Sequence, residues 1–427
     1  MRRLNRPWLF LMLLCSGSVS SLRLNAQSVN ERDVLTGTRL AEGFGVGVTS
    51  SGNRTDWLIQ DGDAMKMAYP SQQAWGAVFV TFGRPTTPPR PSVDLSAFAT
   101  LLIEVRGDPG TTIEIGIKDS IQPDDGTEQK AIMPVFANYR TYAIPLTKFK
   151  RADLKRVYVA AEFVFSGPQA QTVWVRRIKY TTAAAPNVDG VVNGASFRAG
   201  AGAGMWVSLM GQALSGVTRG WADADFQGKK LPKALAGVGV NVNERAMAVA
   251  YVSPTQVNAL VLHDVPSGQS SYFSVSNSVG TSVPVRVVVQ PSFPAFFTLA
   301  PEAGRYVAAV HLDGALVGKA GLFGPAVTTR AAKPGDVVQI YGTSFGTTSP
   351  LSVADEILPG ALPLASLSQV SIRFGSTPAS VDWGGLVLPG LYQFNVRVPN
   401  VADGDQRLSV DLGSAGIQQE VFLAVQR

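Results

Sequence analysis

The stretch with the clearest chemical pattern is Gly342–Gly346, whose Gly-Thr-Ser-Phe-Gly order matches the turn that exposes a nucleophilic serine in many hydrolases. Such a serine needs a strand–turn–helix setting and a histidine base later in the chain. The chain contains two histidines, His263 and His311, and both precede Ser344. Because the serine lacks a base in the required order, the sequence predicts no catalytic residues and no enzymatic activity.

Metal and cofactor chemistry also lacks the residue patterns that it needs. The two histidines are not spaced as a ligand pair, and the single cysteine is Cys15, near the N-terminus. The run Gly200–Gly204, GAGAG, does not have the spacing of a dinucleotide-binding loop. The acidic residues of Pro123–Gly126 do not have the spacing of a calcium loop, so a solvated turn is expected there. The sequence predicts no metal site and no cofactor.

A third set of residues has the chemistry of a carbohydrate site. Sugar recognition combines aromatic rings, which cover the apolar faces of a pyranose, with polar groups that bond its hydroxyls. The segments Leu101–Arg106 and Thr112–Lys118 are each aliphatic on one face and charged on the other. The turn Gly107–Gly110 between them predicts a hairpin with all its charges on one face, where Gly116 would leave room for a ligand. The predicted ligand-binding residues are Trp57, Tyr69, Trp75, Glu104, Arg106, Glu114, Lys118 and Tyr139. The alternative is that the tryptophans pack in the core and the charges form a solvated sheet face.

The elements that must position these residues are strands. Short alternating segments separated by Gly, Pro, Asn and Ser predict β-sandwiches, so we expect an all-β chain. Three segments of the second half recur in the same order at long spacing, which indicates two copies of one domain. The matching segments are Met205–Gly216 with Asp336–Thr347, Val252–Val261 with Pro389–Val398, and Tyr272–Gln290 with Arg407–Gln426.

Composition breaks divide the chain into domains. A jelly-roll sandwich is predicted over 30–183, followed by one repeat over 187–291 and a second over 295–427. The small-residue stretch Thr181–Pro186 separates the first two. Two prolines in Pro291–Pro294 predict a stiff junction between the repeats.

Each repeat carries a pair of amides at corresponding positions. Gln256 and Asn258 align with Gln393 and Asn395, and residues two apart in a strand share a face. The amides would either bind a ligand or satisfy backbone groups of a neighbouring loop. One fold copied twice needs no ligand, so we favour the structural role.

The first 26 residues have the layout of a secretory signal peptide. Arginines precede an apolar run, Trp8–Cys15, and small polar residues follow it. The run is too short to span a bilayer, and cleavage is predicted near Ala26. Leu14 stands where lipid attachment to Cys15 would need a small residue, so lipidation is not expected. We therefore predict a secreted or cell-surface protein without a membrane span.

Removal of this leader changes two inferences from composition. Four of the 37 Lys and Arg residues and none of the 31 acidic residues lie in the leader, so the net charge falls from +6 to +2. The high isoelectric point of about 9.4 is thus largely a targeting feature, and no nucleic-acid partner follows from it. Cys15 is lost as well, which excludes disulfides and thiolate metal ligands from the mature chain.

Four segments of the first region form a recognisable succession: WGAVFV at 75–80, VDLSAFATLLIEVRGDPGTTIEIGIKD at 93–119, YRTYAIPLTKF at 139–149 and VWVRRIKY at 173–180. This succession resembles the galactose-binding-like β-sandwich of many carbohydrate-binding modules and complex-I intermediate-associated proteins. The resemblance spans most of 40–182 and implies a sugar-binding fold. Such modules often hold a structural calcium through an aspartate in the last strand. Here Val175–Ile178 reads Val-Arg-Arg-Ile, and because arginine cannot ligate a cation, no calcium is expected.

The second half has its own resemblance. The segments GVVNGASF at 190–197, LPKALAGVGVNVNERAMAVAYVSPTQVNALV at 231–261, VVQIYGTSFG at 337–346 and GLYQFNVRVP at 390–399 carry it. They resemble a C-terminal domain of bacterial secreted proteins related to the immunoglobulin-like IPT/TIG fold. The resemblance implies tandem modules that serve as spacers, docking units or adhesion units, and it implies no reaction.

These observations together predict an exported, non-enzymatic binding protein. The first domain would contact a glycan or another component of the cell envelope, and the repeats would act as spacers or docking modules. The alternative is a structural or protein-adhesion component of the cell surface with no sugar site. An accessory subunit of a separate enzyme is a third possibility, and the sequence identifies no protein partner.

Overall fold

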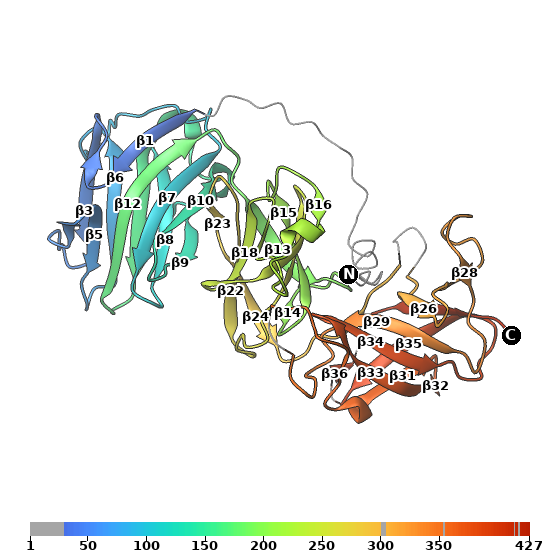
Figure 1. The fold of residues 1–427 in the computed structure, drawn as a ribbon. Helices are drawn as coiled ribbons and strands as arrows, with labels where there is room; N and C mark the ends of the chain where they lie inside the picture. Colours follow the sequence, from blue (N-terminus) through green and yellow to red (C-terminus); the bar gives the residue numbers. More distant parts are fainter. Residues whose placement is uncertain (1–29, 300–304, 353–354, 414, 417–418) are drawn as a thin grey trace.

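The computed structural model describes residues 30–299, 305–352, 355–413, 415–416 and 419–427, so the predicted signal peptide, residues 1–26, lies outside the described residues. Figure 1 shows three lobes of strands in a row, coloured blue to green, green to yellow, and orange to red. Across the described ranges the strands are joined by turns and short 3-10 helices, with no α-helix. The predicted all-β fold class is therefore confirmed. None of the described helical turns is long and apolar enough to cross a membrane.

The first lobe is a sandwich of two sheets, whose hydrogen-bonded neighbours within this lobe are antiparallel. Sheet I has the order β10–β7–β12–β1–β2, with β5 and then β4 added beside β12. Sheet II has the order β3–β6–β11–β8–β9. The strands of sheet I are β1 (Glu31–Thr36), β2 (Arg39–Leu40), β4 (Leu58–Asp61), β5 (Ala64–Tyr69), β7 (Thr100–Gly107), β10 (Arg140–Pro145) and β12 (Gln171–Thr181). The strands of sheet II are β3 (Phe44–Ser50), β6 (Trp75–Phe82), β8 (Thr112–Asp119), β9 (Ala131–Pro134) and β11 (Val157–Ser166).

Alternation along β7 and β8 builds the core between the two sheets. Leu101, Ile103 and Val105 of β7 point inward, as do Ile113 and Ile115 of β8, and each is at most 1% exposed. Burial of an aliphatic side chain of this size contributes about 1.5–3 kcal/mol to stability. The aliphatic faces predicted from the sequence are therefore the faces that hold the sandwich together.

The predicted hairpin of β7 and β8 is wrong. β7 pairs with β10 and β12 in sheet I, whereas β8 pairs with β9 and β11 in sheet II. The turn Gly107–Gly110 thus crosses from one sheet to the other. Two strands with matching aliphatic faces satisfy the same pattern whether they lie side by side or face each other across a core, so alternation alone could not separate the two arrangements. As a result, the charged faces of the two strands point to opposite sides of the lobe.

The second and third lobes are also built from mainly antiparallel sheets. The strands of the second lobe are β13 (Asn187–Asn193), β14 (Ala201–Gly202), β15 (Trp206–Gln212), β16 (Arg219–Gly220), β17 (Ala234–Leu235), β18 (Val238–Val242), β19 (Arg245–Ala246), β20 (Ala248–Val252), β21 (Gln256–Leu260), β22 (Ser270–Ser276), β23 (Thr281–Ser282) and β24 (Val285–Gln290). Those of the third lobe are β25 (Ala295–Phe296), β26 (Ala309–His311), β27 (Leu316–Val317), β28 (Thr329–Arg330), β29 (Val337–Thr343), β30 (Leu362–Pro363), β31 (Val370–Phe374), β32 (Thr377–Pro378), β33 (Ser380–Leu388), β34 (Leu391–Arg397), β35 (Gly404–Leu412), β36 (Ala415–Gly416) and β37 (Val421–Val425). Each of the two lobes contains one parallel strand pair, β14 with β24 and β27 with β28.

The recurring segments occupy corresponding strands in the two later lobes. β15 pairs with β21 as β29 pairs with β34, and β22 pairs with β24 as β35 pairs with β37. The amide pairs also correspond: Gln256 Nε2 donates to Asn258 Oδ1 at 2.8 Å, and Gln393 Nε2 donates to Asn395 Oδ1 at 2.8 Å. The amides therefore bond each other along the strand, and the first pair also bonds Ser208 Oγ on the neighbouring strand β15.

The junction between the first two lobes is a short strand pairing. β23 of the second lobe adds to the edge of β10 in parallel, with Tyr142 opposite Thr281 and Ala143 opposite Ser282. A small apolar cluster of Leu102, Ala143 and Ala185 supports the pairing. Sheet I thus continues across the lobe boundary into the second lobe.

The junction between the second and third lobes is larger and shares a hydrophobic core. Residues of both lobes, including Trp206 and Leu391, belong to one buried cluster. The indole Nε1 of Trp206 donates to the carbonyl of Pro389 at 2.9 Å. Phe293, in the predicted stiff junction, donates its N–H to Ser344 Oγ at 2.8 Å and accepts from Asn193 Nδ2 at 2.8 Å. The linker is thereby bonded to both lobes.

Candidate functional site

The outer face of sheet II carries a groove of about 720 Å³. Its lining comes from β3, β6, β8 and β11 and from the two loops around residues 85–90 and 124–130. Alternation along β11 explains why polar groups line it: Phe163 and Phe165 are fully buried in the core, so Glu162, Val164 and Ser166 point to the other side. We refer to this feature as the groove.

Aromatic side chains form one side of the groove. Trp75 begins β6 and is 45% exposed, and Ala77 and Phe79 follow on the same face. Gly47 lies opposite Phe79 on β3, and a Cβ atom there would come within 2.3 Å of the Phe79 ring. The glycine therefore lets this ring lie over the neighbouring strand. An exposed indole next to a flat apolar surface has the shape that a sugar ring can stack on.

A cluster of charged side chains forms the floor of the groove. Lys118 Nζ lies 3.3 Å from Glu128 Oε2, 3.8 Å from Glu162 Oε1 and 3.6 Å from Asp124 Oδ1. Lys130 forms an ion pair with the other oxygen of Glu128. Lys118, Glu128 and Glu162 are only 5–8% exposed. Glu162 Oε2 is buried and accepts no hydrogen bond within the described residues, so the floor retains one unused acceptor.

Burial and neighbouring charges shift the pKa values of these groups in different directions. Burial raises the pKa of Glu162 to about 7, and the Glu128 carboxylate adds to the rise. Burial would also raise the pKa of Glu128, but the hydrogen bond from Lys130 and the charge of Lys118 hold it below its usual value. Burial would lower the pKa of Lys118, but the Glu162 and Glu128 carboxylates hold it above its usual value. Near neutral pH the floor is therefore poised between one and two buried negative charges.

At one end the groove is closed by an arginine and a tyrosine. The guanidinium carbon of Arg90 lies 5.1 Å from the centre of the Tyr158 ring, and Arg90 forms an ion pair with Asp124. Asp124 comes from the segment predicted to be a solvated turn, and its side chain is 65% exposed while it contacts Arg90 and Lys118. The turn therefore faces both solvent and groove.

At the other end the groove continues into a second hollow of about 530 Å³. Glu114, Val164 and Ser166 line both spaces, and the turn at 108–112 and residues 169–171 complete the second. The two hollows together follow the strands of sheet II from loop to loop. This shape suits an extended ligand more than a single small one.

Two of the predicted ligand-binding residues belong to the core instead. Trp57 is 2% exposed and Tyr69 is 1% exposed, and both rings pack against Phe165. Gly76 makes room for them, because a Cβ atom there would lie 2.8 Å from the Tyr69 ring and 3.1 Å from Trp57. Neither ring can stack on a ligand, so we correct their assignment to the site. Aromatic residue type does not reveal burial, and the glycine that receives them lies on another strand.

The other six predicted residues are divided between the two sheets. Trp75, Glu114 and Lys118 line the groove of sheet II. Glu104 and Arg106 lie on β7 in sheet I, and Tyr139 stands next to Arg106, with ring centre and guanidinium carbon 5.3 Å apart. The single charged face expected from the hairpin does not exist. The residues on sheet II and those on sheet I therefore belong to two separate surfaces. The predicted room at Gly116 is taken by Glu162, whose Oε2 would lie 3.1 Å from an added Cβ atom.

Several groove residues had escaped sequence reasoning. The residues missed are Phe79, Arg90, Asp124, Glu128, Lys130, Tyr158 and Glu162. One signal was available: Glu162 interrupts the apolar strand Val157–Phe165, and a charged residue within a buried strand requires a partner. No comparable signal marks Glu128, because its partners Lys118 and Lys130 meet it only through the fold.

The serine and the two histidines that were considered for catalysis make structural contacts instead. Ser344 is 2% exposed with φ +65°, and its Oγ accepts the Phe293 N–H at the junction of the second and third lobes. His263 Nε2 lies 3.2 Å from Ser352 Oγ, and His311 Nε2 lies 3.2 Å from the Arg330 carbonyl. Among the described residues no group of three or more His, Cys, Asp or Glu is placed to hold a metal ion.

No protein-family profile matches the chain, and no curated protein matches it. Among solved structures, a mutant of the carbohydrate-binding module CBM29-2 complexed with mannohexaose is 12% identical at a TM-score of 0.27, covering 37% of this chain and 95% of that one. The family 30 carbohydrate-binding module of a cellulosomal cellulase of Clostridium thermocellum is 17% identical at a TM-score of 0.27, covering 36% of this chain and 98% of that one. These values identify no ligand for this chain, so the functional argument rests on the groove.

Proposed function

We propose that the first lobe binds a neutral polysaccharide along the groove of sheet II. The observation that carries the proposal is the exposed indole of Trp75 at the edge of a groove whose floor holds a buried Glu162 oxygen without a hydrogen-bond partner. The indole would cover the apolar face of a pyranose, while floor and rim groups would bond its hydroxyls. The two continuous hollows support a chain of several sugar units over a monosaccharide.

The cations of the groove are already paired with carboxylates of the groove, and this pairing favours an uncharged ligand. Each cation of the groove floor already has a carboxylate partner within 4.0 Å: Lys118 with Glu128, Lys130 with Glu128, and Arg90 with Asp124. An acidic sugar would have to compete with these partners and would be repelled by them. A neutral hydroxyl can accept or donate a hydrogen bond without breaking an ion pair.

In this proposal the chain acts outside the cytoplasm without a catalytic step of its own, and the two later lobes hold the first at a set position. The strand pairing of β10 with β23 and the shared core around Trp206 support a spacer role, since both junctions restrict rotation. The alternative of a purely structural protein would be favoured by burial of both Trp57 and Trp75. Only Trp57 is buried, which supports the sugar-binding proposal.

The test compares the full chain with two tryptophan variants. Binding to soluble β-glucan, mannan, xylan and galactan is measured by affinity electrophoresis and calorimetry. We expect Trp75→Ala to weaken binding about tenfold or more, because it removes the stacking surface. Trp174→Ala, on the opposite sheet, is the matched control and should bind like the parent chain. Failure of the parent chain to bind any of these glycans, or equal losses in both variants, would overturn the proposal.

A further inference from the structure

We infer that the first lobe has a second binding surface, on the outer face of sheet I, where Arg106 binds the carboxylate or sulfate groups of an acidic polysaccharide. This inference does not depend on the groove, which lies on the opposite side of the sandwich. The surface is a row of four side chains across neighbouring strands, and we call it the ladder. The ladder consists of Lys66, Trp174, Arg106 and Tyr139.

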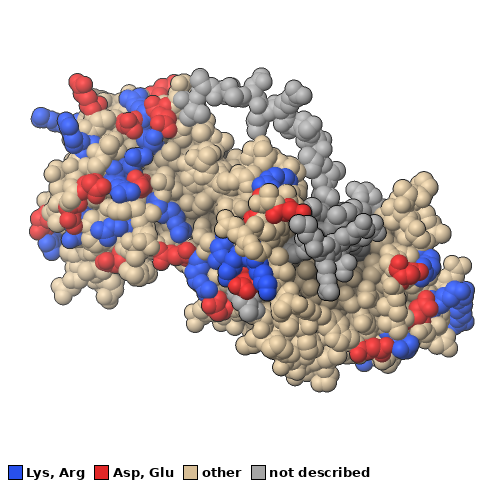
Figure 2. Space-filling model, in the orientation of Figure 1, with Lys and Arg blue, Asp and Glu red and all other residues tan. Residues whose placement is uncertain are grey.

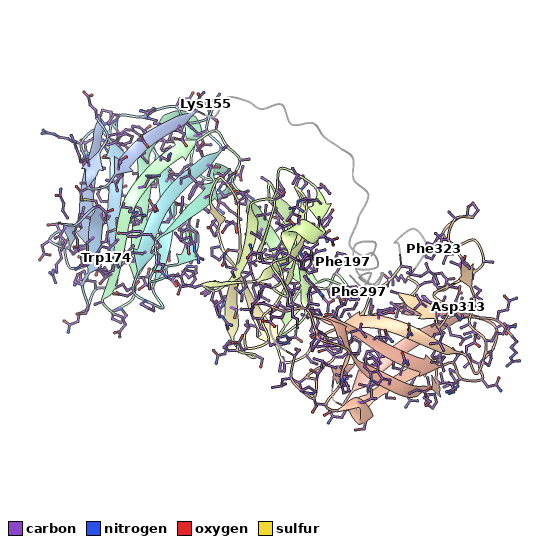
Figure 3. The ribbon with its side chains drawn as sticks, viewed as in Figure 1. Lys155, Trp174, Phe197, Phe297, Asp313 and Phe323 are labelled. Atoms are coloured by element: carbon purple, nitrogen blue, oxygen red, sulfur yellow. The ribbon has the colours of Figure 1, made fainter. Side chains whose placement is uncertain are left out.

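Strand register places the ladder in one line. Trp174 of β12 is opposite Lys66 of β5 on one side and opposite Arg106 of β7 on the other. Tyr139 directly precedes β10, whose first residue, Arg140, pairs with Val105 next to Arg106. Paired residues of antiparallel strands share a face, so the four side chains point outward together. Figure 3 labels Trp174 on this lobe, and Figure 2 shows that charged side chains of both signs gather over it.

Stacking holds the Arg106 guanidinium in place. Its central carbon lies 3.9 Å from the centre of the Trp174 ring and 5.3 Å from that of Tyr139. Lys66 Nζ lies 5.4 Å from the Trp174 ring, and the indole N–H donates to Asp61 at 2.9 Å, which orients the ring. A guanidinium that stacks by its face keeps its N–H donors in the plane and available at its edge.

Among the described residues Arg106 has no carboxylate within 4.0 Å and no side-chain hydrogen bond, although it is only partly exposed. Arg176 is the informative contrast on the same face. The central carbon of its guanidinium lies 4.1 Å from the centre of the Tyr139 ring, but Arg176 also donates to Glu104 at 2.7 Å. Of these two stacked arginines, therefore, Arg176 is neutralised and Arg106 is held rigid without a counter-charge.

This combination favours an anionic group that presents two oxygens to the edge of the guanidinium. A rigid guanidinium binds a carboxylate or sulfate through two parallel hydrogen bonds, and less entropy is lost because the donors are already oriented. Lys66 lies two strands away, at about 10 Å from Arg106 by sheet spacing, and its nearest carboxylate oxygen is 3.9 Å distant. A polymer with repeated acidic groups could reach both cations at once. An extended chain lying across the strands of sheet I would pass over Lys66, Trp174 and Arg106 in turn.

The experiment measures binding of the full chain to alginate and heparin, with dextran as the neutral comparison, at low and high salt. We expect binding of the acidic polymers to be salt-dependent and Arg106→Gln to weaken it about tenfold. Arg305→Gln, which removes the same charge from the third lobe, is the matched control and should leave binding unchanged. Arg106→Lys should restore only part of the affinity, because it keeps the charge but loses the planar donors.

Each alternative outcome would overturn the inference. Equal effects of Arg106→Gln and Arg305→Gln would show that binding follows net charge alone. Absence of acidic-polymer binding by the parent chain, or tighter binding to single-stranded DNA, would exclude an acidic glycan as the occupant. Dimerisation that disappears in Arg106→Gln, measured by light scattering, would assign the ladder to a second copy of the chain. Thermal melting of each variant confirms that it is folded.

Discussion

The two outer faces of the first sandwich treat their charges in opposite ways. On sheet II, Lys118 and Glu162 are almost fully buried beneath the groove, with Lys118 Nζ 3.8 Å from Glu162 Oε1. On sheet I, the Arg106 guanidinium lies against aromatic rings. The neighbouring Arg176 forms an ion pair with Glu104. Both faces come from strands with the same alternation of apolar and charged residues. The neighbouring residues in three dimensions therefore decide whether a charged strand face becomes a buried network or an exposed ladder.

The largest expected difference between the faces concerns stability. Lys118→Ala leaves the Glu128 and Glu162 carboxyl groups buried without their shared cation, and we expect a loss of about 3 kcal/mol in the free energy of unfolding. Lys66→Ala on the ladder should cost about 0.5 kcal/mol or less, because Lys66 has only a distant carboxylate and a weak contact to Trp174. Urea denaturation at pH 7 measures both. Similar losses in the two variants would contradict the contrast between the faces.

The buried carboxyl group should also make stability depend on pH. The pKa of Glu162 is about 7 when folded and near 4.5 when exposed, so between these values the unfolded chain has released a proton that the folded chain retains. The stability contributed by this group is therefore complete below pH 4.5 and is lost as the pH rises to about 7. Because each pKa unit corresponds to about 1.4 kcal/mol, the loss is on the order of 3 kcal/mol.

Glu162→Gln removes this titration, since an amide stays neutral. Relative to the parent chain, the variant should become more stable by that amount as the pH rises from 4.5 to 7. Urea denaturation of both proteins at several pH values measures the difference. Parallel pH profiles would show that Glu162 is not the group that titrates. The ladder residues have no carboxyl group. Arg106→Gln should therefore leave the dependence of stability on pH unchanged.

The smallest expected effect concerns the packing of the Phe79 ring on the aromatic side of the groove. Gly47→Ala places a methyl group 2.3 Å from the present position of the Phe79 ring, so the ring must move. The ring is the far end of a side chain and can rotate, so we expect only about 1 kcal/mol of lost stability and a severalfold loss of neutral-glycan affinity. Acidic-polymer binding by the ladder should not change. A calorimetric comparison with both classes of polymer checks this, and a loss for both would show that the two faces are coupled.

Parts of the site were predictable because they follow from residue type and alternation. The inward faces of β7 and β8, the outward position of Lys118 and Arg106, and the all-β class all follow from period-two patterns. The strand neighbours were not predictable in this way. The turn at Gly107–Gly110 suited a hairpin equally well, so Glu104 and Glu114 were placed on one face when they belong to opposite sheets. Trp57 was misplaced because Gly76, which makes room for it, is recognisable only from the packed core.

The sequence alone determined that this chain folds into strands, that three segments recur in its second half, and which side chains of each strand face a core. These properties depend on local alternation and on internal repetition, both of which can be read along the chain. Only the tertiary structure decided that Lys118 meets Glu128 and Glu162 while Arg106 meets Trp174 and Tyr139. Such contacts join residues far apart in the chain, and they depend on which strands become neighbours when the two sheets close over a shared core.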